Sequence, residues 1–182
     1  MNRLRHRLRF LLMLPLLTLG SGGPATTWAE TASEAQVKGA YLYHFTKFVT
    51  WPTSVFADDG DEFHLCVLGQ DTLGPVLNAL TQKSVGTHPI LILHLTDPKN
   101  ATNCHLLFIS HSEEDQLPAI LEAIQGKPIL TVGDPPEFAR NGGMIHFMRI
   151  NDTLRFAINQ ENARLAGLKI HATLLQVGHV LK

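Results

Sequence analysis

One stretch decides the fold that the sequence predicts: His64-Leu-Cys-Val-Leu-Gly69, followed by Gln70-Asp-Thr-Leu-Gly74. Leu65 to Leu68 is a short apolar run, which is typical of a strand that is covered on both faces of a sheet. A turn rich in glycine follows it, and apolar residues at helical spacing come next, at Val76, Leu77 and Leu80. The order strand, turn, helix indicates the opening of a βαβ unit.

The same alternation continues along the chain. Further strand-like runs lie at residues 89–95, 104–110 and 129–132, and helical patterns lie at residues 73–82, 116–125, 137–140 and 172–181. Two last strand-like runs, 144–150 and 153–159, flank Asn151-Asp152, which is a signal for a two-residue hairpin. The pattern predicts an α/β three-layer sandwich in which a mostly parallel sheet ends in an antiparallel edge hairpin.

An amphipathic helix is expected before the first strand, ending at Trp51-Pro52. The side chains expected to face the core are Val37, Ala40, Tyr41, Phe45 and Phe48. Tyr43 and Trp51 lie off this stripe or at its end. Because exposed aromatic residues are enriched in binding hot spots, these two are the candidate partner-binding residues.

The N-terminus has the features of a secretory signal peptide. Four arginines within the first nine residues precede an apolar run at residues 10–19, and Thr27-Trp28-Ala29 ends in small residues. We therefore expect a signal peptide at residues 1–29 and a single α/β domain at residues 30–182. Cleavage would remove four of 15 basic residues and none of 16 acidic ones, which leaves a net charge of −5. A mildly acidic exported domain is not expected to bind nucleic acid.

The chain has two cysteines, Cys66 and Cys104. Together with His64 and His105 they suggest a zinc site, but their spacing is not that of zinc-ligand pairs. An oxidising compartment favours the other interpretation, a Cys66–Cys104 disulfide.

Motifs for catalysis are not found in the sequence. Gly69 and Gly74 have the spacing of a phosphate-binding loop, but Pro75 stands where that loop needs lysine. A nucleophile-elbow serine is also missing. The sequence therefore predicts a protein that is not an enzyme and that has no metal and no cofactor.

Several segments, taken in order, resemble the YfiR family of periplasmic regulators. They are Val37 to Pro52, Leu65 to Gly69, Cys104 to Ser110, Ile129 to Asp134, Phe138 to Ile145, Arg155 to Asn159 and Ala166 to Ile170. The resemblance implies a Rossmann-like fold, a disulfide matching Cys66 and Cys104, and a possible homodimer. It also implies repression of an inner-membrane diguanylate cyclase through that enzyme's periplasmic sensor domain, which would control cyclic-di-GMP and biofilm formation. The alternative is a periplasmic small-molecule-binding module that serves another membrane receptor or kinase.

The resemblance also brings the strand of Arg155 near the segment of Lys169 and His171. A cluster of these three residues is a candidate site for a carboxylate or phosphate group of a small ligand. The alternative is that Arg155 and Lys169 are solvated surface charges and that His171 caps the last helix.

Overall fold

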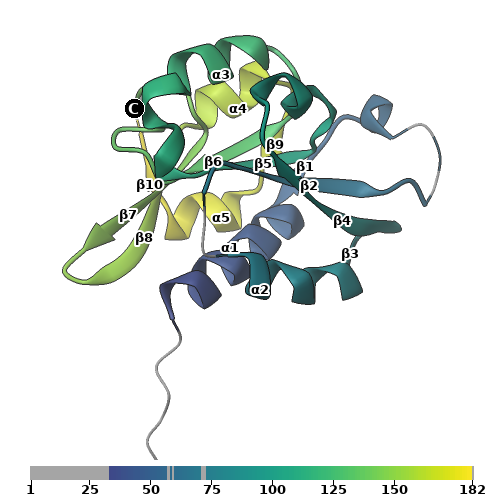
Figure 1. The fold of residues 1–182 in the computed structure, drawn as a ribbon, viewed down its shortest axis with the longest axis horizontal. Coiled ribbons are helices and arrows are strands. Elements are labelled where there is room, and N and C mark those ends of the chain that lie inside the picture. Colours follow the sequence, from purple (N-terminus) through teal and green to yellow (C-terminus); the bar gives the residue numbers. More distant parts are fainter. Residues whose placement is uncertain (1–32, 57, 59, 71–72, 182) are drawn as a thin grey trace, which may run out of the picture. The chain divides into compact units, whose positions relative to one another are not determined.

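Five parallel strands form the centre of the main sheet (Figure 1). In spatial order they are β4 (His88–Leu95), β2 (Phe63–Leu68), β5 (Leu106–Ile109), β6 (Leu130–Gly133) and β7 (Ile145–Ile150). Every neighbouring pair among them is parallel, as the apolar runs of the sequence predict. This computed structural model describes residues 33–56, 58, 60–70 and 73–181, which belong to one compact unit. The expected signal peptide, residues 1–29, lies outside the described residues.

The predicted hairpin is present but is not the edge of the sheet. β8 (Thr153–Ile158) runs antiparallel to β7, and Asn151 and Asp152 between them have φ of 49° and 59°, as a two-residue hairpin turn requires. A further strand, β10 (His179–Val180), pairs parallel to β8 and covers it. At the opposite edge, β3 (Ser84–Val85) pairs antiparallel with the start of β4.

β10 replaces the second half of the expected last helix. Helix α5 (Ala172–Val177) ends at Gly178. A Cβ atom added to Gly178 would lie 2.6 Å from the ring of Phe156, so the chain passes against β8 more closely than a larger residue allows.

A small second sheet consists of β1 (Val49–Thr50) and β9 (Lys169–Ile170), which pair antiparallel. The sequence predicts neither of these two-residue strands. Their pairing joins the end of the first helix to the segment that follows Gly167.

The other helices are α1 (Glu34–Phe48), α2 (Gly74–Leu77), α3 (Leu117–Ala123) and α4 (Gln160–Leu165). Tighter 3-10 helices span Thr53–Val55, Asn78–Gln82, Pro98–Asn103 and His111–Gln116. The expected helix at residues 73–82 is therefore α-helical only in its first turn. The expected short helix at residues 137–140 is a turn instead, because Glu137 adopts a left-handed φ of 55°.

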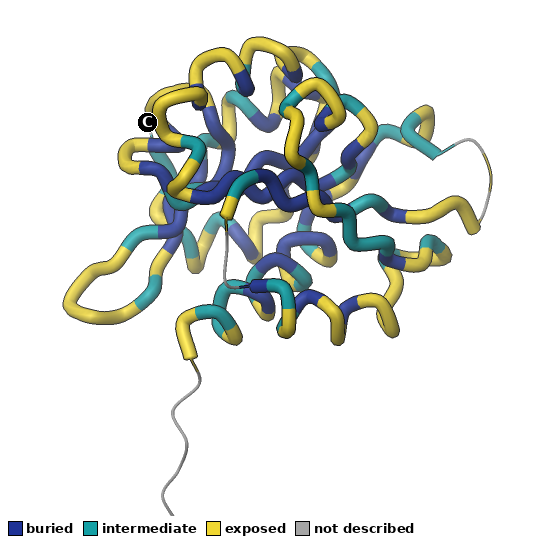
Figure 2. The backbone as a smooth tube through the Cα atoms, viewed as in Figure 1, coloured by how far each residue is buried: buried dark blue, intermediate teal, exposed yellow. Residues whose placement is uncertain are grey.

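Two apolar clusters lie on the two faces of the sheet, which gives the three predicted layers. On β5, Leu106 and Phe108 join the cluster that also includes side chains of α1, α2 and α5. Leu107 and Ile109 join the cluster that includes side chains of α3. Figure 2 shows the buried residues concentrated along the central strands.

The buried face of α1 is rotated relative to the prediction. Leu42 and Phe45 are fully buried, together with Gly39 and Thr46. Ala40 is exposed, and the other predicted core positions of α1 except Phe45 are only partly buried. The reason lies at Gly39, where an added Cβ would be 2.4 Å from the side chain of Val76. The helix therefore turns Gly39 toward α2. This close packing moves the predicted core side chains of α1 partly toward the surface.

Candidate functional site

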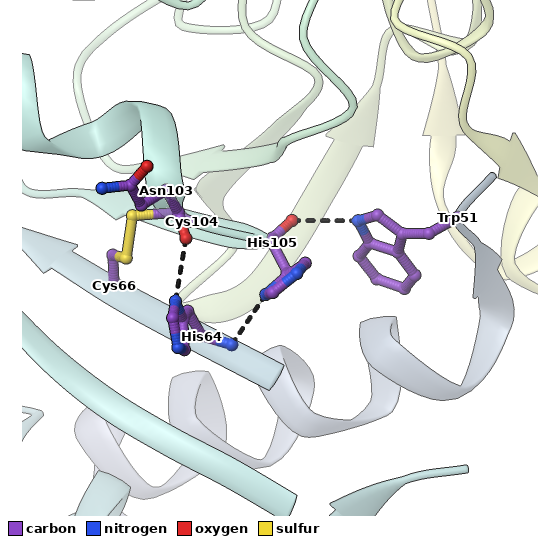
Figure 3. The surroundings of a disulfide bond; sticks show 6 residues. All are labelled: Trp51, His64, Cys66, Asn103, Cys104 and His105. Carbon is purple, nitrogen blue, oxygen red and sulfur yellow. Dashed lines mark hydrogen bonds between the residues drawn. A yellow bond between two sulfur atoms is a disulfide. The ribbon is translucent and has the colours of Figure 1, made fainter. Parts of the chain in front are cut away.

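A disulfide between Cys66 and Cys104 links two neighbouring strands of the central sheet (Figure 3). Cys66 lies in β2, Cys104 lies two residues before the start of β5, and their Cα atoms are 5.9 Å apart. Both residues are buried in the apolar cluster that includes α3. The predicted pairing is confirmed, and the bonded sulfur atoms are not available as zinc ligands.

Two histidines lie beside the disulfide and contact each other (Figure 3). The backbone N–H of His64 donates to Nδ1 of His105 at 2.8 Å, and the ring Nδ1 of His64 lies 2.9 Å from the carbonyl oxygen of Asn103. Within the described ranges, no group of three or more His, Cys, Asp or Glu residues is arranged to hold a metal ion. The two histidines contribute hydrogen bonds and packing near the amino ends of β2 and β5.

His105 is held in its neutral form. Burial, followed by the nearby His64 and His88, lowers the pKa of His105 to about 4. The ring of Phe56 stacks on the rings of His88 and His105, with centroid distances of 3.8 Å and 4.8 Å. A neutral ring also agrees with the hydrogen bond that Nδ1 of His105 accepts from His64, since a protonated nitrogen cannot accept.

Trp51 is not a free surface residue, and this part of the prediction is wrong. Its side chain is 8% exposed and packs edge-on against Phe63, with ring centroids 5.0 Å apart. Its indole N–H donates to the carbonyl oxygen of His105 at 3.0 Å. Trp51 does not belong to the apolar face of α1, but it follows β1 directly and so lies against the central sheet.

Tyr43 is half-buried at the margin of the core. The ammonium group of Lys47 lies 4.8 Å from the centroid of its ring, and His44 beside it is exposed. Ala40, one turn earlier, is exposed as well. These four residues form the outer face of α1, which is accessible around Tyr43. The role of Tyr43 in partner binding stays a prediction.

The three residues of the predicted anion site are not brought together. Lys169 and His171 flank the buried Ile170 and point outward, as their alternation predicts. Arg155 is exposed on β8 and alternates with Phe156, which belongs to the same core cluster as Ile170. Arg155 therefore leaves the sheet on the opposite face. The Nε2 atom of His171 lies 3.0 Å from the hydroxyl oxygen of Thr50, and ligand binding by this segment stays a prediction.

The carboxyl ends of β2 and β5 mark the point where the chain reverses its direction across the sheet, which is where such folds bind ligands. Here the two loops bond to each other. The hydroxyl of Ser110 donates to the carbonyl oxygen of Gln70, and the N–H of Gln70 donates to the hydroxyl oxygen of Ser112 at 2.9 Å. A Cβ on Gly69 would lie 2.5 Å from Ser112 and 2.6 Å from Glu113. These bonds tie the two loops together, and a hollow of about 350 Å³ remains beside them, lined by residues 68–70, 95–96 and 112–113.

A group of charged residues that no local sequence pattern marks lies near the carboxyl ends of β6 and β7. Lys38 of α1 contacts Asp134 after β6 at 2.8 Å and Glu34 at 2.9 Å, and Glu34 also contacts Arg149 of β7 at 2.7 Å. Burial raises the pKa of Asp134 despite its bond to Lys38. For Lys38, burial acts to lower the pKa, but its hydrogen bonds to Asp134 and Glu34 outweigh that effect and raise it. The group attaches the start of α1 to the sheet.

The fold and its buried disulfide define the class of this molecule, a Rossmann-like α/β domain. In addition, no helix among the described residues is long and apolar enough to cross a membrane. The sequence profile of the YfiR/HmsC-like family matches residues 35–179, and the chain belongs to this family. A comparison with curated proteins found no match.

Proposed function

We propose that this chain is an exported regulator that binds the periplasmic sensor domain of a membrane-bound diguanylate cyclase and represses that enzyme. The observation that carries the proposal is the family match, which covers residues 35–179. The Cys66–Cys104 disulfide supports an oxidising compartment such as the periplasm. In this proposal the leader at residues 1–29 is removed, and the remainder acts as one domain.

The proposal requires protein contact rather than nucleotide chemistry. The first βα turn has Pro75 where a phosphate-binding loop needs lysine. At the carboxyl ends of the central strands, where ligands bind in this architecture, hydrogen bonds tie the two loops together beside a hollow of about 350 Å³.

The outer face of α1 is the surface that we assign to the partner. It presents Ala40, Tyr43, His44 and Lys47, so it combines an aromatic ring and small apolar groups with a cation. The ion pairs of Lys38 and Glu34 and the contact of Gly39 with Val76 hold the opposite side of this helix in place. A rigid helix loses little conformational freedom on binding, which favours affinity.

The test is expression of the full chain in a bacterium together with a diguanylate cyclase that has a periplasmic sensor domain. The expected result is a fall in cellular cyclic-di-GMP that disappears when residues 1–29 are deleted, because the regulator then stays on the wrong side of the membrane. A cyclase whose sensor domain has been removed is the matched control and should not respond. Unchanged cyclic-di-GMP, together with no binding of the purified regulator to any sensor domain of this kind, would reject the proposal.

A second candidate function, a small-molecule-binding module for another receptor, is favoured by a different observation. A cavity of about 250 Å³ opens between α3 and α4, away from the outer face of α1.

A further inference from the structure

Helices α3 and α4 lie near each other (Figure 1), and a small cavity lies between the end of α3 and α4. Its volume is about 250 Å³. A water molecule occupies roughly 30 Å³ in the liquid, so the cavity has room for about eight atoms of that size. Drug-sized ligands fill larger pockets, so the occupant of this one is small.

The walls of the cavity are largely apolar. The apolar side chains that line it are Leu121, Ile124, Ile129, Met144, Leu165 and Ala166. Leu165 is 64% exposed, one of three large apolar side chains that stand out in this way on the described surface. An exposed leucine at the rim of an apolar cavity gains stability when a hydrophobic ligand covers it.

One cation lines this cavity, Lys127. It is half-buried, and its side chain forms no ion pair and no hydrogen bond with the described residues. The one acidic residue of the lining, Glu122, is exposed and forms no ion pair with it. A ligand carboxylate within reach of this ammonium group would form a charge-assisted hydrogen bond with it.

The backbone holds Lys127 in place at the cavity. Its N–H donates to the carbonyl oxygen of Ile124 at 3.1 Å, and its carbonyl oxygen accepts from the N–H of Ile129 at 2.8 Å. Gly126 permits this turn because it adopts a left-handed φ of 73°. The turn that ends α3 therefore fixes the backbone of the lysine beside the cavity.

We propose that this cavity binds a short aliphatic monocarboxylate, whose carboxylate pairs with Lys127 while its chain lies against Ile124, Ile129 and Leu165. A single cation matches a single negative charge, whereas a phosphate group calls for several donors. Six carbons and two oxygens match the volume, so hexanoate is the probe. Asn162 also lines the cavity, and its amide nitrogen donates to the carbonyl oxygen of Gly143 at 3.3 Å.

The experiment compares hexanoate, 1-hexanol, hexylammonium and acetate on the mature chain at equal concentration and ionic strength. Hexanoate is expected to raise the melting temperature by a few degrees at millimolar concentrations, by mass action, and the other three should give less. Methyl signals of Leu165 and Ile129 in NMR spectra should shift with hexanoate, which locates the site.

Two variants decide the assignment. Lys127→Met keeps the aliphatic stem and should abolish the advantage of hexanoate over 1-hexanol, whereas the matched Lys99→Met, at an exposed lysine outside the cavity lining, should not. Leu165→Glu places a carboxylate at an exposed rim position, so it leaves the fold intact and should abolish hexanoate binding. The proposal is overturned if hexanoate causes no shift, if the shift is the same in Lys127→Met, or if the perturbed methyl groups lie elsewhere. None of these outcomes bears on repression of a cyclase, which the α1 surface tests separately.

Discussion

The indole nitrogen of Trp51 donates to the carbonyl oxygen of His105 at 3.0 Å, and the same oxygen accepts the backbone N–H of Leu130 at 2.9 Å. One acceptor therefore joins the segment after α1 to the hydrogen bonds between β5 and β6. The arrangement explains why Trp51 is buried although its position in the sequence suggests an exposed aromatic residue.

Replacing Trp51 should therefore reduce stability rather than partner recognition alone. Trp51→Ala is expected to lower the free energy of unfolding by about 3–5 kcal/mol, the usual range for emptying a buried aromatic site. Trp51→Phe should cost less, about 1 kcal/mol for the lost hydrogen bond, because the His105 oxygen still accepts from Leu130. Urea denaturation of the two variants measures both values. Equal stability of Trp51→Ala and the parent would show that the indole is not part of the core.

The disulfide should make a large contribution to the stability of this domain. It closes a loop with a sequence separation of 38 residues. For this length the chain-entropy model gives about 4 kcal/mol, which corresponds to a fall in melting temperature of roughly 10 °C. Cys66→Ala, Cys104→Ala and the double variant should all lose about the same amount, since each removes the same bond. Two free thiols titrated in protein purified from the periplasm would contradict the pairing.

Acid should destabilise the domain through His105. Its pKa is about 4 in the folded protein and 6.5 as the ordinary value, so the unfolded chain binds a proton first as the pH falls. Stability from this group is complete above about pH 6.5, declines as the pH falls from there, and is lost by about pH 4. Because solvent partly screens the ring, we expect a loss of about 1–2 kcal/mol rather than the full value of the shift.

The comparison that isolates this effect is His105→Gln against the parent, with the free energy of unfolding measured from pH 8 to pH 4. The amide oxygen of glutamine can still accept from the N–H of His64, so the variant keeps an uncharged acceptor. Its stability should fall less steeply with acid than that of the parent. An exposed control, His111→Gln, should follow the parent curve, and parallel curves for all three proteins would exclude His105 as the titrating group.

Most of the fold could be predicted because the parallel strands are buried on both faces. A run such as Leu65 to Leu68 has no other place in a folded chain, and its order with the helical patterns leaves few topologies. The hairpin was equally predictable, because Asn and Asp tolerate the left-handed φ that both central residues of such a turn adopt, as Asn151 and Asp152 do here. The disulfide could be predicted because the chain has two cysteines and its expected compartment is oxidising.

What could not be predicted depends on close packing between distant segments. The contact of Gly39 with Val76 rotates α1, and no local pattern signals it. β1 and β9 have two residues each, too few to show a period, yet their pairing is what buries Trp51 beside the sheet. The cavity beside Lys127 combines residues from three separate segments, 121–131, 142–144 and 162–166, so no single stretch of sequence marks it.

The outer face of α1 gives the last prediction, which separates partner binding from folding. Tyr43 is half-buried and packs against the core, so Tyr43→Ala alone confounds the two effects. His44 is exposed on the same face, and His44→Glu adds a negative charge beside Lys47 without opening the core.

Both His44→Glu and Tyr43→Ala should weaken binding to a partner sensor domain at least tenfold in calorimetry, about 1.4 kcal/mol, as expected for residues near the centre of an interface. The matched control is Asn100→Glu, which adds the same charge at an exposed position away from α1. His44→Glu should keep the melting temperature of the parent, whereas Tyr43→Ala should lower it. If His44→Glu and Asn100→Glu bind the sensor domain equally well, the partner contacts a different surface. An unpaired carboxylate buried in an interface would lower the affinity.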